Sequence, residues 1–159
     1  LERVYFIVTG SSASASELVM NSLNAHIEVN VIGSKTVGKQ VGSITLYDSD
    51  NLQRTGENLN TNHTYAMQPL VLEIKNKDDI NFPNGIIPGT NFTGIEWSED
   101  IGDLGTLGER SDPLLEKTLN FIATGEKTFS KKENVINSEI IFNSKLATPA
   151  GNNMYSELK

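Results

Sequence analysis

The residues best able to do chemistry in this sequence are a serine in a turn of small residues and a lysine in a glycine-bounded loop. Ser14 lies within residues 11–17, Ser-Ser-Ala-Ser-Ala-Ser-Glu, directly before a helical pattern. A serine at the N-terminus of a helix faces unpaired N–H groups and the positive end of the helix dipole. Such donors can stabilise an oxyanion. Because a serine hydroxyl alone is a weak nucleophile, this site would need a base.

Histidine, the usual base, is poorly placed in this chain. The sequence has two histidines, His26 and His63. His26 lies about twelve residues along the helix that Ser14 begins, and a helix rises ~1.5 Å per residue, so the two side chains cannot meet. His63 lies in a polar loop, where we expect it to face solvent. We therefore expect no Ser-His-Asp triad.

A lysine is the remaining candidate for the base. A lysine can accept a proton only when it is neutral, and burial in apolar surroundings favours the neutral form. Lys39 has Val37 and Val41 on either side, whereas Lys35 has polar neighbours. Lys39 is therefore the lysine that the sequence predicts to be drawn inward.

Two motifs at a fixed separation resemble the C-terminal-processing (tail-specific) serine peptidases, an S41-type family. Residues 12–17 resemble the S-A-S-A-S-E motif of that family, and residues 33–39 resemble its G-x-K-T-x-G-K loop. The resemblance implies that Ser14 is the nucleophile and that Lys39, 25 residues later, is its base. Neither motif alone would be specific, but the two together at this spacing are.

The similarity spans about residues 4–124, because the turn at residues 84–88 and the helix start at Asp112 also match the family. It implies an α/β fold related to the ClpP/crotonase superhelix of β-β-α units. Residues 1–125 would be the C-terminal part of the protease domain, and residues 126–159 a tail with one strand at 138–142. It further implies cleavage of C-terminal or unstructured segments of proteins, a location in the bacterial cell envelope (periplasmic or anchored to the outer membrane) and a PDZ domain upstream.

The resemblance also assigns supporting roles around the dyad. The N–H of Ala15 would form half of the oxyanion hole, and the second donor would come from an upstream segment that this sequence lacks. A family glutamine that orients the lysine is replaced by Ser43, so Ser43 and Gln40 are the two candidates for that role. No metal or cofactor is implied. Since loss of one oxyanion donor costs ~10²–10³ in kcat, we expect this chain alone to be a weak or inactive peptidase.

The same residues allow other interpretations. Ser14 and Glu17 fit a capping box, which is common before a helix. Residues 33–40 fit the start of a P-loop, although Gln40 stands where a magnesium-binding Ser or Thr belongs and a strand pattern follows instead of a helix. A non-catalytic relative that binds peptide tails or scaffolds an assembly is the second functional hypothesis, and the absence of glutamine at Ser43 favours it.

Apolar patterns predict the elements that hold these loops. Residues 4–8 and 28–32 are predicted strands, joined by a helix whose apolar face carries Leu18, Val19, Ser22, Leu23 and Ile27. Residues 41–47 and 65–74 are predicted strands on either side of a polar loop at 48–63. The order strand, helix, strand indicates an α/β unit.

The sequence after residue 65 gives fewer signals. Pro69 indicates an edge strand or a bulge. Residues 94–108 are predicted to be irregular, and Trp97 within them to be a core residue. A second helix is predicted to begin with Asp112 as its cap and to end at Gly125.

Composition excludes several classes of function. The 159 residues are about one domain in size, and the net charge of −7 argues against nucleic acid and against anionic lipid surfaces as partners. The absence of cysteine excludes disulfides and a thiol nucleophile. No apolar run reaches the ~18 residues that span a bilayer, so no membrane insertion of this segment is expected. Because the chain opens directly on a strand pattern, we expect it to be a fragment of a longer protein.

Overall fold

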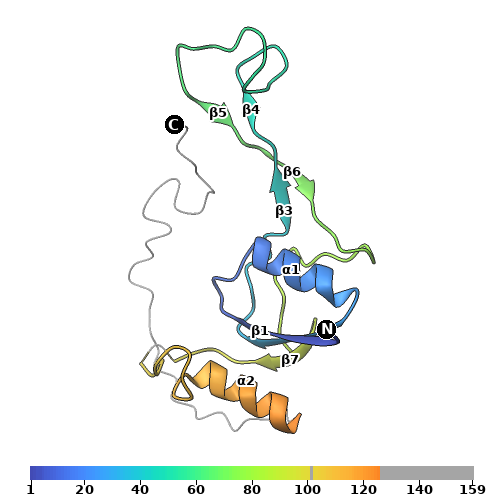
Figure 1. Ribbon diagram of the computed structural model, residues 1–159, viewed down its shortest axis with the longest axis vertical. Helices are drawn as coiled ribbons and strands as arrows, with labels where there is room; N and C mark the ends of the chain where they lie inside the picture. The colour runs from blue at the N-terminus through green and yellow to red at the C-terminus, as the bar shows by residue number, and fades with distance from the viewer. Residues whose placement is uncertain (101, 126–159) are drawn as a thin grey trace. The chain divides into compact units, whose positions relative to one another are not determined.

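The computed structural model describes residues 1–100 and 102–125, which contain seven strands and two helices (Figure 1). The chain divides into two compact units. The described part of the first unit comprises residues 1–44, 68–100 and 102–125, and that of the second comprises residues 45–67. The tail at 126–159 and its predicted strand at 138–142 lie outside the described residues.

A parallel three-stranded sheet is the centre of the first unit. Its strands are β1 (Arg3–Val8), β2 (Glu28–Gly33) and β7 (Thr93–Glu96), in the order β1-β2-β7. Helix α1 (Ala15–Asn24) connects β1 to β2. The predicted strand–helix–strand unit is therefore confirmed.

Strand β7 corrects the prediction that residues 94–108 are irregular throughout. Its sequence, Thr-Gly-Ile-Glu, carries one apolar residue and a glycine, which locally reads as a turn. Gly94 is needed because a Cβ there would lie 1.7 Å from the carbonyl oxygen of Val31 on the neighbouring strand. Pairing with β2 thus overrides the weak local preference.

The sheet separates two apolar cores, with α1 on one face and α2 (Pro113–Thr124) on the other (Figure 1). Alternate residues of a strand point to opposite faces. Val29 and Val31 of β2 accordingly pack in the core that includes Met20 of α1, whereas Ile32 packs with Phe121 of α2. Residues 29–33 of β2 are all buried, as is usual for a strand in the middle of a parallel sheet that is covered on both faces.

Helix α1 buries part of the face that its apolar residues predict, together with two polar side chains. Leu23 and Ile27 pack against the core as predicted. The buried residues are Glu17, Met20 and Asn21, while Val19 is 47% exposed. The helix also ends at Asn24, so Ile27 lies beyond it. The prediction was incomplete because two polar side chains find hydrogen-bond partners inside the fold, which a hydrophobicity pattern does not reveal.

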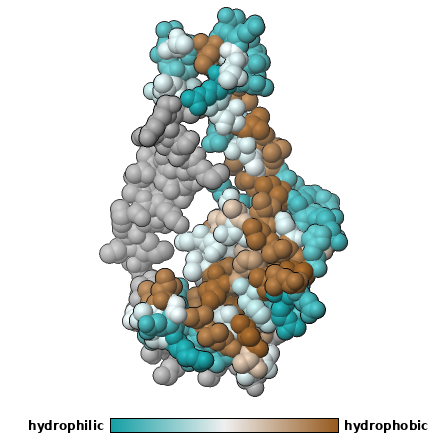
Figure 2. All heavy atoms as spheres, in the orientation of Figure 1, coloured by the Kyte–Doolittle hydropathy of each residue, from teal (hydrophilic) through white to brown (hydrophobic). Residues whose placement is uncertain are grey.

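The two long strands predicted around the polar loop are each divided. Residues 41–47 form β3 (Val41–Ser43) and β4 (Leu46–Tyr47), and residues 65–74 form β5 (Ala66–Met67) and β6 (Leu70–Glu73). Strand β3 pairs with β6, and β4 with β5, both antiparallel. The pairing of β3 with β6 is irregular between Gly42 and Ser43, next to Pro69 in space, as the proline predicted. Apolar surface is exposed on β6 (Figure 2), where Leu70, Val71 and Leu72 are each more than half exposed.

Helix α2 begins and ends where the sequence predicts. Asp112 Oδ1 accepts hydrogen bonds from the N–H groups of Leu114 and Leu115, both at 3.1 Å, and Gly125 closes the helix in the left-handed conformation at φ 70°. Trp97 packs against the α2 core, as predicted, and Lys117 Nζ lies 3.4 Å from the centre of its ring. Burial lowers the pKa of Lys117.

Replacing Asp112 by alanine removes the acceptor for two N–H groups of α2. We expect Asp112→Ala to lower the free energy of unfolding by about 1 kcal/mol, as for other lost caps. Urea unfolding measures this change. Asp103→Ala, at an exposed loop carboxylate, is the matched control and should change stability by less than about 0.5 kcal/mol. Equal stability of the two variants would contradict the capping role.

Candidate functional site

The serine turn and the lysine loop leave the same edge of the sheet. Val8, the last residue of β1, pairs with Gly33, the last residue of β2. The turn that contains Ser14 follows β1, and the loop that contains Lys39 follows β2. Because the strands are parallel, both segments start at the carboxyl ends of neighbouring strands, where α/β sheets usually bind ligands. The N–H of Val37 donates to the carbonyl of Ser12 at 3.0 Å, which joins the two segments directly.

Ser14 has a strained backbone. It is the N-cap of α1 and has φ 55° and ψ −111°, a combination that residues with a side chain rarely adopt. Such a conformation costs on the order of 1–3 kcal/mol and persists only where its surroundings impose it. Strain of this kind concentrates at functional sites, including the sharp strand-to-helix turns that present nucleophilic serines. The sequence gives no sign of it, since the residue is not glycine.

The other serines of the motif have different environments. The Ser12 hydroxyl accepts a hydrogen bond from the N–H of Thr9 at 3.1 Å, so it closes the turn. Ser16 is exposed on the first turn of α1. Ala15 is the first residue of α1 and is exposed. Its N–H therefore has no acceptor within the helix.

The carboxylate of Glu17 joins the serine turn to the lysine loop. Glu17 is completely buried. Its Oε2 accepts from the N–H of Ser14 at 3.0 Å and from the N–H of Lys39 at 2.7 Å. Its Oε1 accepts from the Thr36 hydroxyl at 2.5 Å and from the N–H of Gly38 at 2.6 Å. The bond from Ser14 confirms one half of the predicted capping box, but the other three donors come from the lysine loop.

The turn at residues 82–88 supports the lysine loop from a third segment. The Thr36 hydroxyl accepts from the N–H of Ile86 at 2.7 Å, and the N–H of Thr36 donates to the carbonyl of Ile86 at 3.0 Å. Gly38 and Gly85 allow the backbones of the lysine loop and of this turn to approach each other closely. A Cβ at Gly38 would lie 2.3 Å from the carbonyl oxygen of Pro83, and one at Gly85 would lie 2.1 Å from that of Thr36.

The two lysines of the loop differ as predicted. Lys39 is half-buried and Lys35 is exposed. The residues named as candidates to orient the lysine lie close by in the chain. Ser43 is half-buried in β3 opposite Leu70, and Gln40 is buried. Whether either orients Lys39 stays a prediction.

Gln40 is tied to α1 by a buried polar network that the sequence did not indicate. Its Oε1 accepts from Asn21 Nδ2 at 2.9 Å, while its Nε2 is buried without a hydrogen-bond partner among the described residues. Asn76 Nδ2 donates to Asn21 Oδ1 at 3.1 Å, and Asn76 Oδ1 accepts from the N–H of Ile80 at 3.0 Å. The network thus holds the turn at residues 76–80 against α1.

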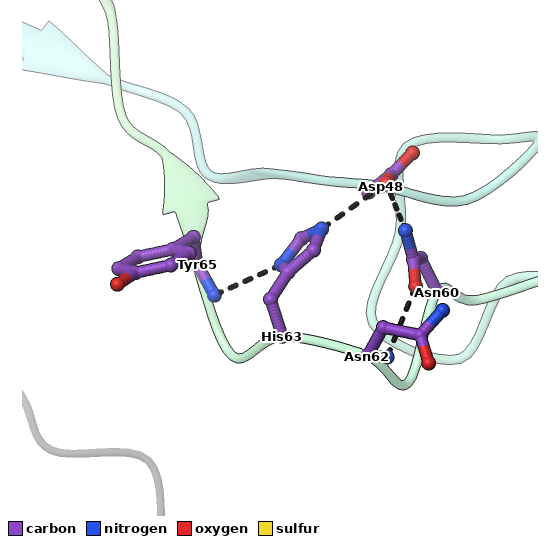
Figure 3. A network of polar contacts seen from close by, with 5 residues as sticks. All are labelled: Asp48, Asn60, Asn62, His63 and Tyr65. Carbon is purple, nitrogen blue, oxygen red and sulfur yellow. Dashed lines mark hydrogen bonds and ion pairs between the residues drawn. The ribbon is translucent and has the colours of Figure 1, made fainter.

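The two histidines have different surroundings. His26 lies just beyond the C-terminal end of α1, at the opposite end from Ser14, as predicted. His63, in the second unit, is engaged on both ring nitrogens (Figure 3). Its Nε2 lies 3.2 Å from Asp48 Oδ2, and its Nδ1 accepts from the N–H of Tyr65 at 3.2 Å. With its side chain 30% exposed, His63 is less open to solvent than predicted.

Asp48 is the shared acceptor of this loop. Asn60 Nδ2 donates to the same Oδ2 at 2.9 Å (Figure 3). The hydrogen bond from Asn60, followed by that from His63, lowers the pKa of Asp48. These hydrogen bonds stabilise the loop, which is a structural role for its polar residues.

Two further kinds of site can be assessed. A P-loop is excluded because the strand β3, not a helix, follows Gln40.

Among residues 1–100 and 102–125, no three or more His, Asp or Glu side chains are grouped to hold a metal ion. In the same part of the chain, neither helix is long and apolar enough to cross a membrane.

Comparison with known proteins gives one match, to a solved structure. No family model matches the sequence, and no curated protein matches it. The matching structure is named as a candidate S41 protease from Bacteroides fragilis. It superimposes with a TM-score of 0.59 at 21% sequence identity over 79% of this chain. The match covers 28% of the length of that protein. The described residues thus share the mixed α/β fold of part of an S41-type structure.

The strain at Ser14 predicts an unusual order of stabilities. Glycine adopts positive φ readily, so Ser14→Gly should be more stable than Ser14→Ala by about 1 kcal/mol, as measured by urea unfolding. Ser16, inside α1, is the matched control, and there glycine should be less stable than alanine by about 0.5–1 kcal/mol. The same order at both positions would show that Ser14 is unstrained.

Proposed function

We propose that this chain carries the nucleophile and the base of a serine-type peptidase, with Ser14 as nucleophile and Lys39 as base. One observation carries the proposal. The N–H groups of Ser14 and Lys39 donate to the same oxygen, Glu17 Oε2, at 3.0 and 2.7 Å. Residues 25 apart in the sequence are thereby held beside one buried carboxylate. The fold shared with an S41-type structure supports the same assignment.

The chemistry follows from the roles of these groups. Neutral Lys39 Nζ takes the proton of the Ser14 hydroxyl as Oγ attacks the scissile carbonyl, and then gives it to the leaving amine. The resulting acyl-enzyme is released by a water molecule that Lys39 activates in the same way. The N–H of Ala15, at the start of α1, would stabilise the oxyanion together with the helix dipole. This mechanism needs no metal or cofactor.

The substrates in this proposal are C-terminal or unstructured segments of proteins. A bacterial envelope location and an upstream PDZ domain belong to the same proposal, and both rest on the family resemblance of the two motifs. The match covers 28% of the related structure. Activity is therefore proposed for the whole protein, and the weakness predicted for this chain alone is part of the same proposal.

A non-catalytic peptide-binding or scaffolding protein is the second candidate. Serine at position 43 and the bond between Gln40 and Asn21 favour it, because both reduce the means of orienting Lys39. The strained Ser14 argues against it, since a binding module gains nothing from strain at a serine. Peptide binding that is unchanged in Ser14→Ala, without turnover by the wild type, would favour this candidate.

Replacement of the dyad in the full-length protein tests the proposal. We expect Ser14→Ala to abolish hydrolysis of a disordered protein substrate, and Lys39→Ala to lower kcat by about 10²–10⁴-fold, the usual contribution of a general base. Lys35→Ala, which removes the exposed lysine of the same loop, is the matched control and should retain wild-type kcat. A Lys39→Ala enzyme as active as wild type would refute the proposal.

A further inference from the structure

Glu17 makes far more contacts than a helix cap requires. A capping box needs its acid to accept one hydrogen bond, from the N-cap N–H. Glu17 accepts four, two on each oxygen, and three come from residues 36–39. The carboxylate is completely buried, and burial of a carboxylate is unfavourable unless its oxygens accept hydrogen bonds. Capping of α1 therefore does not account for its position.

The identity of the four donors requires a carboxylate. The N–H groups of Ser14, Gly38 and Lys39 can only donate, and at least one of them bonds to each oxygen of Glu17; the Thr36 hydroxyl donates to Oε1 as well. Both side-chain oxygens must therefore be acceptors. An ionised carboxylate meets this condition, whereas an amide would place its own N–H₂ against at least one backbone N–H donor, whichever way it is turned.

We propose that Glu17 is a positioning residue of the reaction, which fixes the backbone of Lys39 against the turn of Ser14. This inference rests on the proposed function. Glu17 would contact neither the substrate nor the proton that is transferred. It would act by fixing the position of the base relative to the nucleophile. A displacement of about 1 Å between reacting groups can lower the rate about 10²-fold, so the relative position of the serine turn and the lysine loop matters for kcat.

The four groups that donate to Glu17 determine how its substitution should change kcat. Glu17→Gln keeps the size of the side chain and turns at least one of its hydrogen bonds into a contact between two donors. The lysine loop then has to shift or leave buried N–H groups unpaired. Glu17→Asp keeps two acceptor oxygens on a shorter side chain, so some of the four bonds can re-form. The predicted order of kcat is wild type, then Glu17→Asp, then Glu17→Gln.

The control variant must loosen the same helix without touching the lysine loop. Leu23 of α1 meets this need. It is partly buried and packs against the apolar core on the α1 face of the sheet. Leu23→Ala should therefore be destabilised and yet keep wild-type kcat while it is folded.

The experiment measures kcat and KM of the full-length variants on a fluorogenic peptide, with the rate at which a fluorophosphonate labels Ser14. Each is assayed at a temperature where its unfolding curve shows it to be folded. We expect Glu17→Gln to lose about 10²-fold in kcat and in labelling rate, with KM changed by less than about threefold, and Glu17→Asp to lose about tenfold. Labelling reports on Ser14 itself, so a purely structural role would leave it unchanged in the folded protein.

Wild-type kcat in folded Glu17→Gln would overturn the positioning role, and so would an equal loss in Leu23→Ala. Should Glu17→Gln not fold, Glu17→Asp decides the question by the same two criteria. Failure of the underlying function is a separate result. In that case Ser14→Ala would hydrolyse the peptide as fast as the wild type, whatever Glu17 does.

Discussion

A single buried carboxylate organises the candidate site. Removing Glu17 from water is unfavourable, and the cost is offset only because all four of its hydrogen bonds are made. Those bonds come from the serine turn and from the lysine loop. The arrangement of both segments therefore depends on one side chain of α1. The turn at residues 82–88 extends the same set of bonds through Thr36 and Ile86.

The topology makes this arrangement possible. Strands β1 and β2 are parallel neighbours, so the segments that follow them begin at one edge of the sheet. Helix α1 lies between the strands in sequence and places Glu17 one turn from its N-terminus. The strained conformation of Ser14 is then held by its bond to Glu17 and by the helix that starts at Ala15. Strain persists where several contacts impose it, and here they come from both sides of the residue.

Local patterns predicted the parts of the structure that local chemistry determines. The first two strands, the cap at Asp112 and the end of α2 at Gly125 are where the sequence indicates. The spacing of the serine and lysine motifs also predicted two segments that the fold brings together. The apolar pattern missed the polar part of the buried face of α1, and it missed β7, which depends on pairing with β2. Glu17 was read only as a cap because its other three partners lie about twenty residues away and are joined to it by the fold. The sequence does contain one indication that Glu17 is buried. Glu17 lies three and four residues before Met20 and Asn21, so the three side chains share one face of the helix.

The distance from Ser14 Oγ to Lys39 Nζ in a crystal structure of the full-length protein tests the central claim most directly. The account predicts a separation within hydrogen-bond reach, about 2.6–3.2 Å, or slightly longer without substrate. Two well-ordered side chains that point away from each other, with the Glu17 contacts intact, would contradict it. The carboxylate would then hold the two segments together for a purpose other than proton transfer.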